Sequence, residues 1–230
     1  MSNSYVLPYV NPDTDGVCSA IALAFFLKKS RGEAATPIYW GKLDSETDFV
    51  LQQSGSVIHL APRELEPNSR YYIVDTHQSN QLPSNLPFAS VVEIIDHHPT
   101  GDSDLFPNAQ ITNEAIGAAA TIIAEKFRGN NIDPGQVIAQ LLFSAIISNT
   151  LDLKAPTTTQ RDIDAIKWLG TLITLDSDYK NRMFSARSSI GDVTTTDILI
   201  GDYKEFDFSG HLVGIGVMET TSPAYAFRRK

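Results

Sequence analysis

The chain has 230 residues, of which 42% are hydrophobic and 20% are charged. This length allows one large domain or two small ones, and this composition excludes disordered and collagen-like chains. The single cysteine, Cys18, excludes an internal disulfide and a multi-cysteine zinc cluster. That cysteine usage favours a reducing cytoplasm, where we expect the protein. The longest strongly apolar run, residues 17–27, is too short to cross a bilayer, so no membrane span is expected.

The formal charge at pH 7 is −9, from 18 basic and 27 acidic residues without a long block of either sign. Such a chain is not expected to bind long nucleic acids through their backbones. An acidic protein can act on small phosphorylated substrates if bound cations offset its own field. Cation ligands are therefore the residues to look for.

Apolar runs and helical patterns alternate through the first half of the chain. We expect strands at 6–10, 36–40, 57–60, 71–74 and 91–95, with helices at 17–27 and 44–53. The last two strand runs are uninterrupted apolar or β-prone stretches, which is typical of strands covered on both faces. This alternation predicts an α/β fold with a doubly wound, mostly parallel sheet flanked by helices.

The pattern becomes helical from Glu114 onward and changes again near residue 188. We expect helices at 115–127, 134–149, 161–169 and 177–187, followed by a β-hairpin formed by 202–208 and 211–218. The change of texture predicts a first domain over 1–188. Residues 189–230 would form a short, partial α+β C-terminal segment, which is small for an independent domain.

Three of the expected strands end in acidic residues. The first leads into Asp13 and Asp15, the fourth into Asp75, and the fifth into the run Asp96-His97-His98 at 96–98. Ligands of open α/β sheets bind outside the carboxyl ends of the strands, so these side chains should meet at one edge. Crowded carboxylates need raised pKa values or cations, and Asp with His suits Mn²⁺, Co²⁺, Mg²⁺ or Zn²⁺.

Each of these residues also has a structural explanation. Asp13 or Asp15 could cap the helix that begins near Gly16, and Asp75 could be an ordinary turn residue. A pair of histidines, taken by itself, is more often part of a surface loop than of a site. The coincidence of all of them at strand ends favours the functional interpretation.

These residues, in this order, resemble the DHH phosphoesterase superfamily. The motifs are Asn-Pro-Asp-Thr-Asp at 11–15, Val-Asp at 74–75 and Asp-His-His at 96–98, with further likeness at 114–121, 144–157, 202–206 and 213–216. The greatest likeness is to the manganese-dependent, or family II, inorganic pyrophosphatases. The resemblance covers nearly the whole chain and implies a shortened C-terminal DHH-associated domain.

The resemblance implies a centre of two divalent ions, Mn²⁺ or else Mg²⁺ or Co²⁺. By this resemblance Asp75 bridges both ions, Asp13 holds the first, and Asp15 and His97 hold the second. Hydrolysis would then use a hydroxide bridged by the two metals, without a phosphoenzyme. The last metal-binding Asp of the family is replaced here by Asn149, which can still offer a neutral carbonyl oxygen.

The resemblance also assigns residues to the substrate. His98 would face the phosphate as a hydrogen-bond donor or acid, and Asp96 would orient the neighbouring imidazoles. Lys204 would bind the electrophilic phosphate as a mobile point charge. Arg228 and Arg229 would partly replace a basic clamp that the family carries further along its C-terminal domain; a solvated basic tail is the other interpretation.

A second departure from the family is Tyr9, which stands where the family has a metal-binding His. Tyrosine, with an ordinary pKa near 10, is a poor ligand unless a cation lowers that value. Together with Asn149 this change predicts weaker binding of Mn²⁺ and Co²⁺, and a drift of selectivity toward oxygen-preferring Mg²⁺.

The leading hypothesis is a metal-dependent phosphohydrolase that acts on a phosphoanhydride, with pyrophosphate as the first candidate. A nucleotide or short-oligonucleotide phosphodiesterase or phosphatase of the same superfamily is the second. The third is a degenerate member that binds phosphate in a regulatory role, which Tyr9 and Asn149 favour. A homodimer is a further expectation from the family.

Overall fold

The computed structural model describes residues 3–187, 203–208 and 211–216. The chain divides into two units, Met1–Asp176 and Ser177–Lys230, which are described separately. None of the helices in these described segments is both long enough and apolar enough to cross a membrane.

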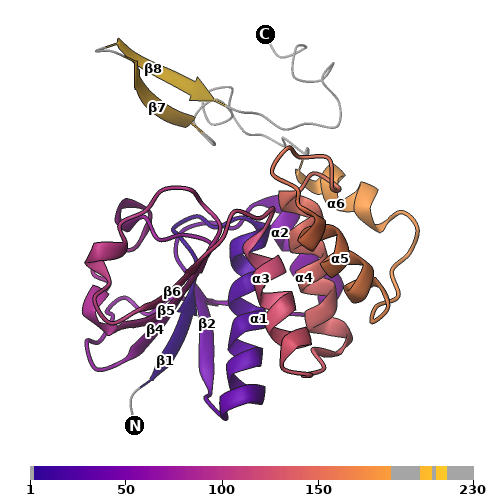
Figure 1. Ribbon diagram of the computed structural model, residues 1–230, viewed down its shortest axis with the longest axis horizontal. Coiled ribbons are helices and arrows are strands. Elements are labelled where there is room, and N and C mark those ends of the chain that lie inside the picture. Colours follow the sequence, from indigo (N-terminus) through magenta and orange to yellow (C-terminus); the bar gives the residue numbers. More distant parts are fainter. Residues whose placement is uncertain (1–2, 188–202, 209–210, 217–230) are drawn as a thin grey trace. The chain divides into compact units, whose positions relative to one another are not determined.

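A six-stranded sheet forms the centre of the first unit (Figure 1). Its strands are β1 (Ser4–Leu7), β2 (Ala35–Tyr39), β3 (His59–Leu60), β4 (Arg70–Val74), β5 (Val91–Asp96) and β6 (Gln110–Asn113). Their order is β3-β2-β1-β4-β5-β6, and every neighbouring pair is parallel. The predicted parallel sheet is confirmed, and the strand order reverses direction beside β1.

The helices of this unit gather on one face of the sheet (Figure 1). They are α1 (Thr14–Arg31), α2 (Ser45–Ser54), α3 (Ala119–Gly129), α4 (Gly135–Asn149) and α5 (Gln160–Gly170). The first, α1, contacts α2, α3 and α4, and α3 also contacts β5. Parallel strands joined by right-handed crossovers place α1 and α2 on the same face, because both belong to the half of the sheet that grows away from β1 in one direction.

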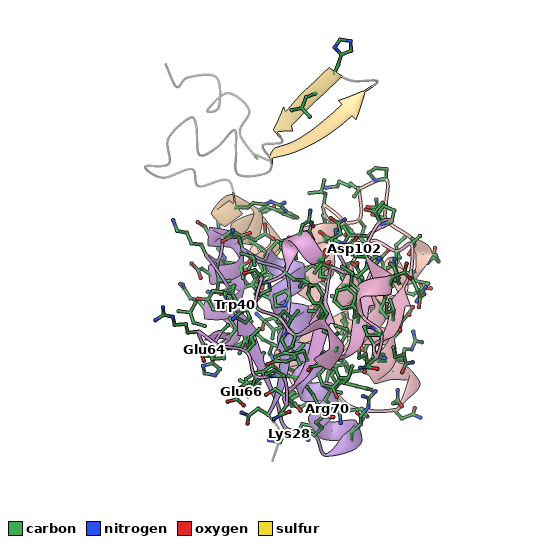
Figure 2. The ribbon with its side chains drawn as sticks, turned by 90° about the vertical axis from the view of Figure 1, so that its left-hand side faces the viewer. Lys28, Trp40, Glu64, Glu66, Arg70 and Asp102 are labelled. Carbon is green, nitrogen blue, oxygen red and sulfur yellow. The ribbon has the colours of Figure 1, made fainter. Side chains whose placement is uncertain are left out.

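The opposite face is covered by the connections between β4, β5 and β6. These connections contain short 3-10 helices at Ser79–Gln81, Phe88–Ser90 and Ser103–Leu105 instead of α-helices. Apolar side chains of the strands and of the loops on this face pack in one core: Leu7, Ile38, Leu65, Tyr71, Ile73, Leu82, Leu86, Val91, Ile94 and Phe106. Figure 2 faces this layer, with Arg70 at the start of β4 toward its lower end and Asp102 toward its upper end.

A buried carboxylate ties the helices to the sheet. Glu93 of β5 is buried and forms ion pairs with Arg31 of α1 at 3.1 Å and with Lys126 of α3 at 3.0 Å. A buried charge is tolerated when it is paired and hydrogen-bonded. This pair of contacts fixes α1 and α3 on the same strand.

Three differences from the sequence expectation change the elements beside the carboxyl edge of the sheet. The first strand ends at Leu7 instead of Val10, because residues 8–13 turn over the edge of the sheet. Strand β6 was not predicted, since Gln110–Asn113 is a short, polar edge strand without apolar alternation. Helix α3 begins at Ala119, four residues later than expected, and residues 114–118 form a loop.

The second unit contains helix α6 (Tyr179–Arg187) and a two-stranded antiparallel sheet. Its strands, β7 (Tyr203–Phe208) and β8 (His211–Gly216), pair from Tyr203 with Gly216 to Phe208 with His211. The predicted hairpin is thus present. Lys204 lies on β7, whereas Arg228 and Arg229 lie outside the described residues.

Candidate metal centre

The acidic and imidazole residues meet at the carboxyl edge of three neighbouring strands. Strands β1, β4 and β5 are adjacent in the sheet, so the residues that follow them lie side by side. Ligand atoms of Asp75, His97 and His98 all lie within 4.8 Å of one another. Among the described residues, these three form a group of His and Asp side chains close enough together to hold a metal ion.

Asp75 is the most constrained member of this group. It is buried, follows β4 with a φ of 64°, and donates its backbone N–H to Ile95. Its Oδ1 lies 3.2 Å from His97 Nε2 but has no hydrogen bond of acceptable geometry. Burial, together with the charges of Asp15 and Asp13, raises the pKa of Asp75 well above its usual value. A positive charge at this oxygen would relieve both penalties.

Asp13 and Asp15 act as helix caps at the same edge. Asp13 caps α1 by accepting from the Gly16 backbone N–H at 3.0 Å. Asp15 is buried and accepts from the N–H groups of Ala119 and Ala120, at 2.7 and 2.9 Å, so it caps α3 from a distant part of the chain. Burial raises the pKa of Asp15 to about 6, with a further contribution from Asp13 and partial opposition from His97. Asp15 also accepts from the Ser19 hydroxyl at 3.1 Å and from the Asn149 amide at 3.4 Å, which uses the roughly four acceptor sites of a carboxylate, so a cation at Asp15 would replace some of these contacts.

The two imidazoles are oriented by different partners. His97 Nδ1 lies 2.9 Å from the Ile116 carbonyl oxygen, to which it donates, and this leaves Nε2 directed at Asp75. Burial alone lowers the pKa of His97, but Asp75 beside Nε2 and the charge of Asp15 raise that pKa to about 10. His98 Nδ1 instead lies 2.8 Å from Asp96 Oδ1, which leaves its Nε2 available.

Asp96 connects the imidazole of His98 with a second one that the sequence interpretation missed. Its carboxylate accepts from the backbone N–H of His97 at 2.7 Å and forms a short contact with Nδ1 of the buried His77. Although burial opposes it, hydrogen bonds from His98 and His77 lower the pKa of Asp96 to about 2. A Cβ at Gly101 would lie 2.0 Å from the His77 ring, so glycine is required there. No pattern in the sequence marks His77.

The two departures from the family pattern both face this edge. The Tyr9 hydroxyl accepts from the Asp13 backbone N–H at 3.1 Å, and burial with the charges of Asp13 and Asp75 raises the pKa of Tyr9 well above 10. Asn149, the last residue of α4, directs its amide nitrogen at the site. Tyr9 therefore stays a neutral phenol in this environment.

The orientation of Asn149 follows from its neighbours. Its Nδ2 lies 2.9 Å from the Gly117 carbonyl oxygen, 3.4 Å from Asp15 Oδ2 and 3.3 Å from His97 Nε2. Carbonyl and carboxylate oxygens are acceptors, so the amide presents its donor side to them. The expected carbonyl oxygen of Asn149 is therefore not the atom that faces Asp15 in this arrangement.

A pocket of about 680 Å³ opens beside these groups. Its lining comes from the ends of β5 and β6, the loop before α3 and the end of α4: His97, His98, Pro99, Asn113, Ala115, Ile116, Asn149 and Thr157. Pockets of this size hold small molecules. The donor set of carboxylate oxygens and imidazole nitrogens is of the kind that Mn²⁺, Mg²⁺ and Zn²⁺ accept, and the buried Asp75 oxygen without a hydrogen bond fits such a cation.

A parallel sheet with an acidic and imidazole-rich carboxyl edge defines the class of α/β proteins whose site lies at the point where the strand order reverses. Residues 3–146 match the description "DHH family, N-terminal domain", and residues 181–230 match "DHHA2 domain". The chain therefore belongs to the DHH family.

Curated and solved relatives agree with this assignment. The "Manganese-dependent inorganic pyrophosphatase" of Methanothrix thermoacetophila is 34% identical over 221 residues, which cover 94% of this chain and 70% of that protein. The "Probable manganese-dependent inorganic pyrophosphatase" of Clostridium acetobutylicum is 34% identical over 217 residues, with coverages of 94% and 70%. A crystal structure from Methanococcus jannaschii, assigned to the family II inorganic pyrophosphatases, superposes with a TM-score of 0.81 at 30% identity, covering 97% of this chain and 74% of that one.

Proposed function

We propose that this chain is a metal-dependent phosphohydrolase that cleaves a phosphoanhydride, with inorganic pyrophosphate as its first substrate. The similarity to manganese-dependent inorganic pyrophosphatases supports the reaction class. The single observation that carries the proposal is the buried Asp75 oxygen without a hydrogen bond, beside His97 and at the carboxyl edge of the sheet. A carboxylate in that position is costly unless a cation pairs with it.

Four residues of the first unit would hold two divalent ions, Mn²⁺ or else Mg²⁺ or Co²⁺. In this proposal Asp75 would be a ligand of both ions, Asp13 would contribute to one, and Asp15 and His97 would contribute to the other. Asn149 stands beside them as a neutral group. When bound, divalent ions supply a nucleophilic water of lowered pKa and neutralise charge on the phosphoryl oxygens.

The imidazole of His98 is suited to act on the substrate. Its Nδ1 is held by Asp96, so Nε2 can direct a proton into the pocket that His98 lines. A carboxylate behind an imidazole fixes the direction of its ring and its tautomer. We assign His98 as the hydrogen-bond donor or acid for the leaving phosphate, and Asp96 as the residue that orients it.

Further parts of the proposal concern the C-terminal segment and the assembly. Lys204, Arg228 and Arg229 are proposed to bind substrate phosphates as basic groups. The first domain is proposed to end near residue 188, with 189–230 as the C-terminal segment. We also propose a cytoplasmic protein, since Cys18 is a lone thiol, and a homodimer by analogy with the family.

The test is phosphate release by metal-stripped protein to which Mn²⁺, Mg²⁺ or Co²⁺ is added in turn. We expect turnover of pyrophosphate with at least one ion, and a turnover rate more than about 100-fold lower in Asp75→Asn. Changes to residues that only orient metal ligands typically lower activity by about 10–100-fold. Asparagine tolerates the positive φ of residue 75, so this variant keeps the backbone.

Asp164→Asn, an exposed substitution on α5, is the matched control and should keep wild-type activity. An unchanged rate in Asp75→Asn would refute the assigned role. Turnover of a dinucleotide but not of pyrophosphate would favour the phosphodiesterase alternative, and no turnover with any ion would favour the regulatory one.

A further inference from the structure

Asp162, on the first turn of α5, has more hydrogen-bond partners than a helix cap requires. It is fully buried and accepts from the Thr159 backbone N–H and hydroxyl, both at 2.7 Å, which completes the capping box of α5. It also accepts from the Thr121 hydroxyl at 2.6 Å and from the Gly117 backbone N–H at 3.0 Å. The last contact joins α5 to the loop that borders the metal centre.

The approach of this loop to Asp162 depends on glycine. A Cβ at position 117 would lie 2.8 Å from Asp162 Oδ2 and 2.7 Å from a methyl carbon of Thr150. Real Cβ atoms do not approach other atoms so closely, and both neighbours are buried. The Ile116–Gly117 peptide is therefore pressed against the carboxylate.

The same peptide contacts His97 with its other end. Because a trans peptide directs its N–H and C=O in opposite directions, the Gly117 N–H reaches Asp162 while the Ile116 carbonyl accepts from His97 Nδ1 at 2.9 Å. A carboxylate at the N–H end polarises the peptide and makes its carbonyl a stronger acceptor. Asp162 thus acts on the imidazole without touching it.

We propose that Asp162 is a positioning residue, which holds the imidazole of His97 through the Ile116–Gly117 peptide so that Nε2 stays directed at Asp75. The arrangement corresponds to the carboxylate behind a ligating histidine in many metal sites, with one peptide group inserted between them. This inference rests on the proposed function only in naming His97 as a metal ligand.

The test compares Mn²⁺ affinity, measured from the signal of free Mn²⁺ in electron paramagnetic resonance, with stability to urea. Asp162→Asn keeps the shape of the side chain and removes its charge, and we expect Mn²⁺ binding to weaken roughly 10–100-fold. Thr121→Val removes another hydrogen bond of the same carboxylate but leaves the Gly117 contact. We expect it to lose stability while keeping wild-type affinity.

Equal affinity losses in both variants would mean that Asp162 only stabilises the fold, and unchanged affinity in a folded Asp162→Asn would also overturn the proposal. A second measurement needs no variant. In metal-free wild-type protein, NMR should find the His97 Nδ1 proton and the Gly117 amide proton protected from exchange with water. If both protons exchange as fast as those of exposed amides, the proposed connection from Asp162 through the Ile116–Gly117 peptide to His97 is refuted. Neither readout requires turnover, so an absence of pyrophosphate hydrolysis would affect the proposed function alone.

Discussion

Asn149 and Tyr9 are neutral, so the metal centre carries less negative charge than it would with carboxylates at these two positions. Burial and the charge of Asp13 already raise the pKa of Asp15, and burial with the charges of Asp15 and Asp13 raises the pKa of Asp75, so a neutral amide at 149 avoids adding a fourth carboxylate. The amide nitrogen also donates to the Gly117 carbonyl, which stabilises the loop before α3. Without metal the amide thus donates to two oxygen acceptors, the Gly117 carbonyl and the Asp15 carboxylate.

Replacing Asn149 with Asp should therefore have opposite effects on the metal-free and the metal-bound protein. The Nδ2 atom of Asn149 lies 3.4 Å from Asp15, so a carboxylate oxygen in its place would repel the Asp15 carboxylate and could not donate to the Gly117 carbonyl. We therefore expect the free energy of unfolding of the metal-free protein to fall by about 1–3 kcal/mol. Added ligand charge should tighten Mn²⁺ binding by about tenfold, since affinity follows the ligand charge count. Urea denaturation and Mn²⁺ titration measure the two effects.

Asn113→Asp is the control for this prediction, because Asn113 lines the same pocket from strand β6 and contacts the His98 carbonyl instead. If Asn113→Asp tightens Mn²⁺ binding as much as Asn149→Asp does, the effect is one of general charge and not of position 149.

At the scale of elements, a strained turn follows α4 directly after Asn149. Leu151, Asp152 and Leu153 all have positive φ values, of 50°, 56° and 63°. The left-handed conformation costs about 1–2 kcal/mol for a residue with a side chain, so three in succession are unusual. Hydrogen bonds hold the turn: Thr150 receives the N–H groups of Lys154 and Ala155 on its carbonyl oxygen. The turn redirects the chain so that Thr157 reaches the pocket.

Leu151→Asn should stabilise the protein by about 1 kcal/mol, because asparagine tolerates a positive φ and the leucine side chain is 39% exposed. The comparison is Leu105→Asn, at a side chain that is 46% exposed and has no positive φ. Chemical denaturation of both variants decides the question. Equal effects at 151 and 105 would show that backbone strain at the turn contributes nothing to stability.

For the molecule as a whole, a polar network at the other end of the sheet makes the free energy of unfolding depend on pH in the alkaline range. The Tyr72 hydroxyl of β4 donates to Glu33 at 2.8 Å, and Arg70 donates to the same hydroxyl at 3.0 Å. Burial and the neighbouring Glu33 raise the pKa of Tyr72 to about 12. Since the unfolded chain loses this proton near pH 10, the contribution of Tyr72 is complete below pH 10 and is lost between pH 10 and pH 12.

Tyr72→Phe should accordingly be less stable than the wild type at pH 8, by about 1 kcal/mol for the lost hydrogen bond. That deficit should shrink by roughly 1 kcal/mol as the pH rises from 10 to 11. In this range the unfolded wild type loses the Tyr72 proton while the folded wild type keeps it, which lowers the stability of the wild type alone. Urea denaturation at each pH measures the difference, with Tyr39→Phe as a second tyrosine-to-phenylalanine change. A difference that stays constant with pH would contradict the raised pKa.

The fold was largely predictable because its signals are local. Apolar runs of strand length and helical periodicity are properties of consecutive residues, so the parallel sheet, its helices and the C-terminal hairpin were expected correctly. Strand β6 was missed because an exposed edge strand needs no apolar pattern. The late start of α3 was missed because its cap is Asp15, which lies more than a hundred residues away in the chain.

The sequence by itself determined which chemistry could gather at the site, since acidic residues and histidines follow the ends of strands that must share an edge. Only the tertiary structure decided which atoms those residues present. The donor side of Asn149, the Asp75 oxygen without a hydrogen bond and the link from Asp162 to His97 all depend on backbone groups and distant helices. The direction of a hydrogen bond depends on which groups are neighbours in space, and the order of residues along the chain does not specify these neighbours.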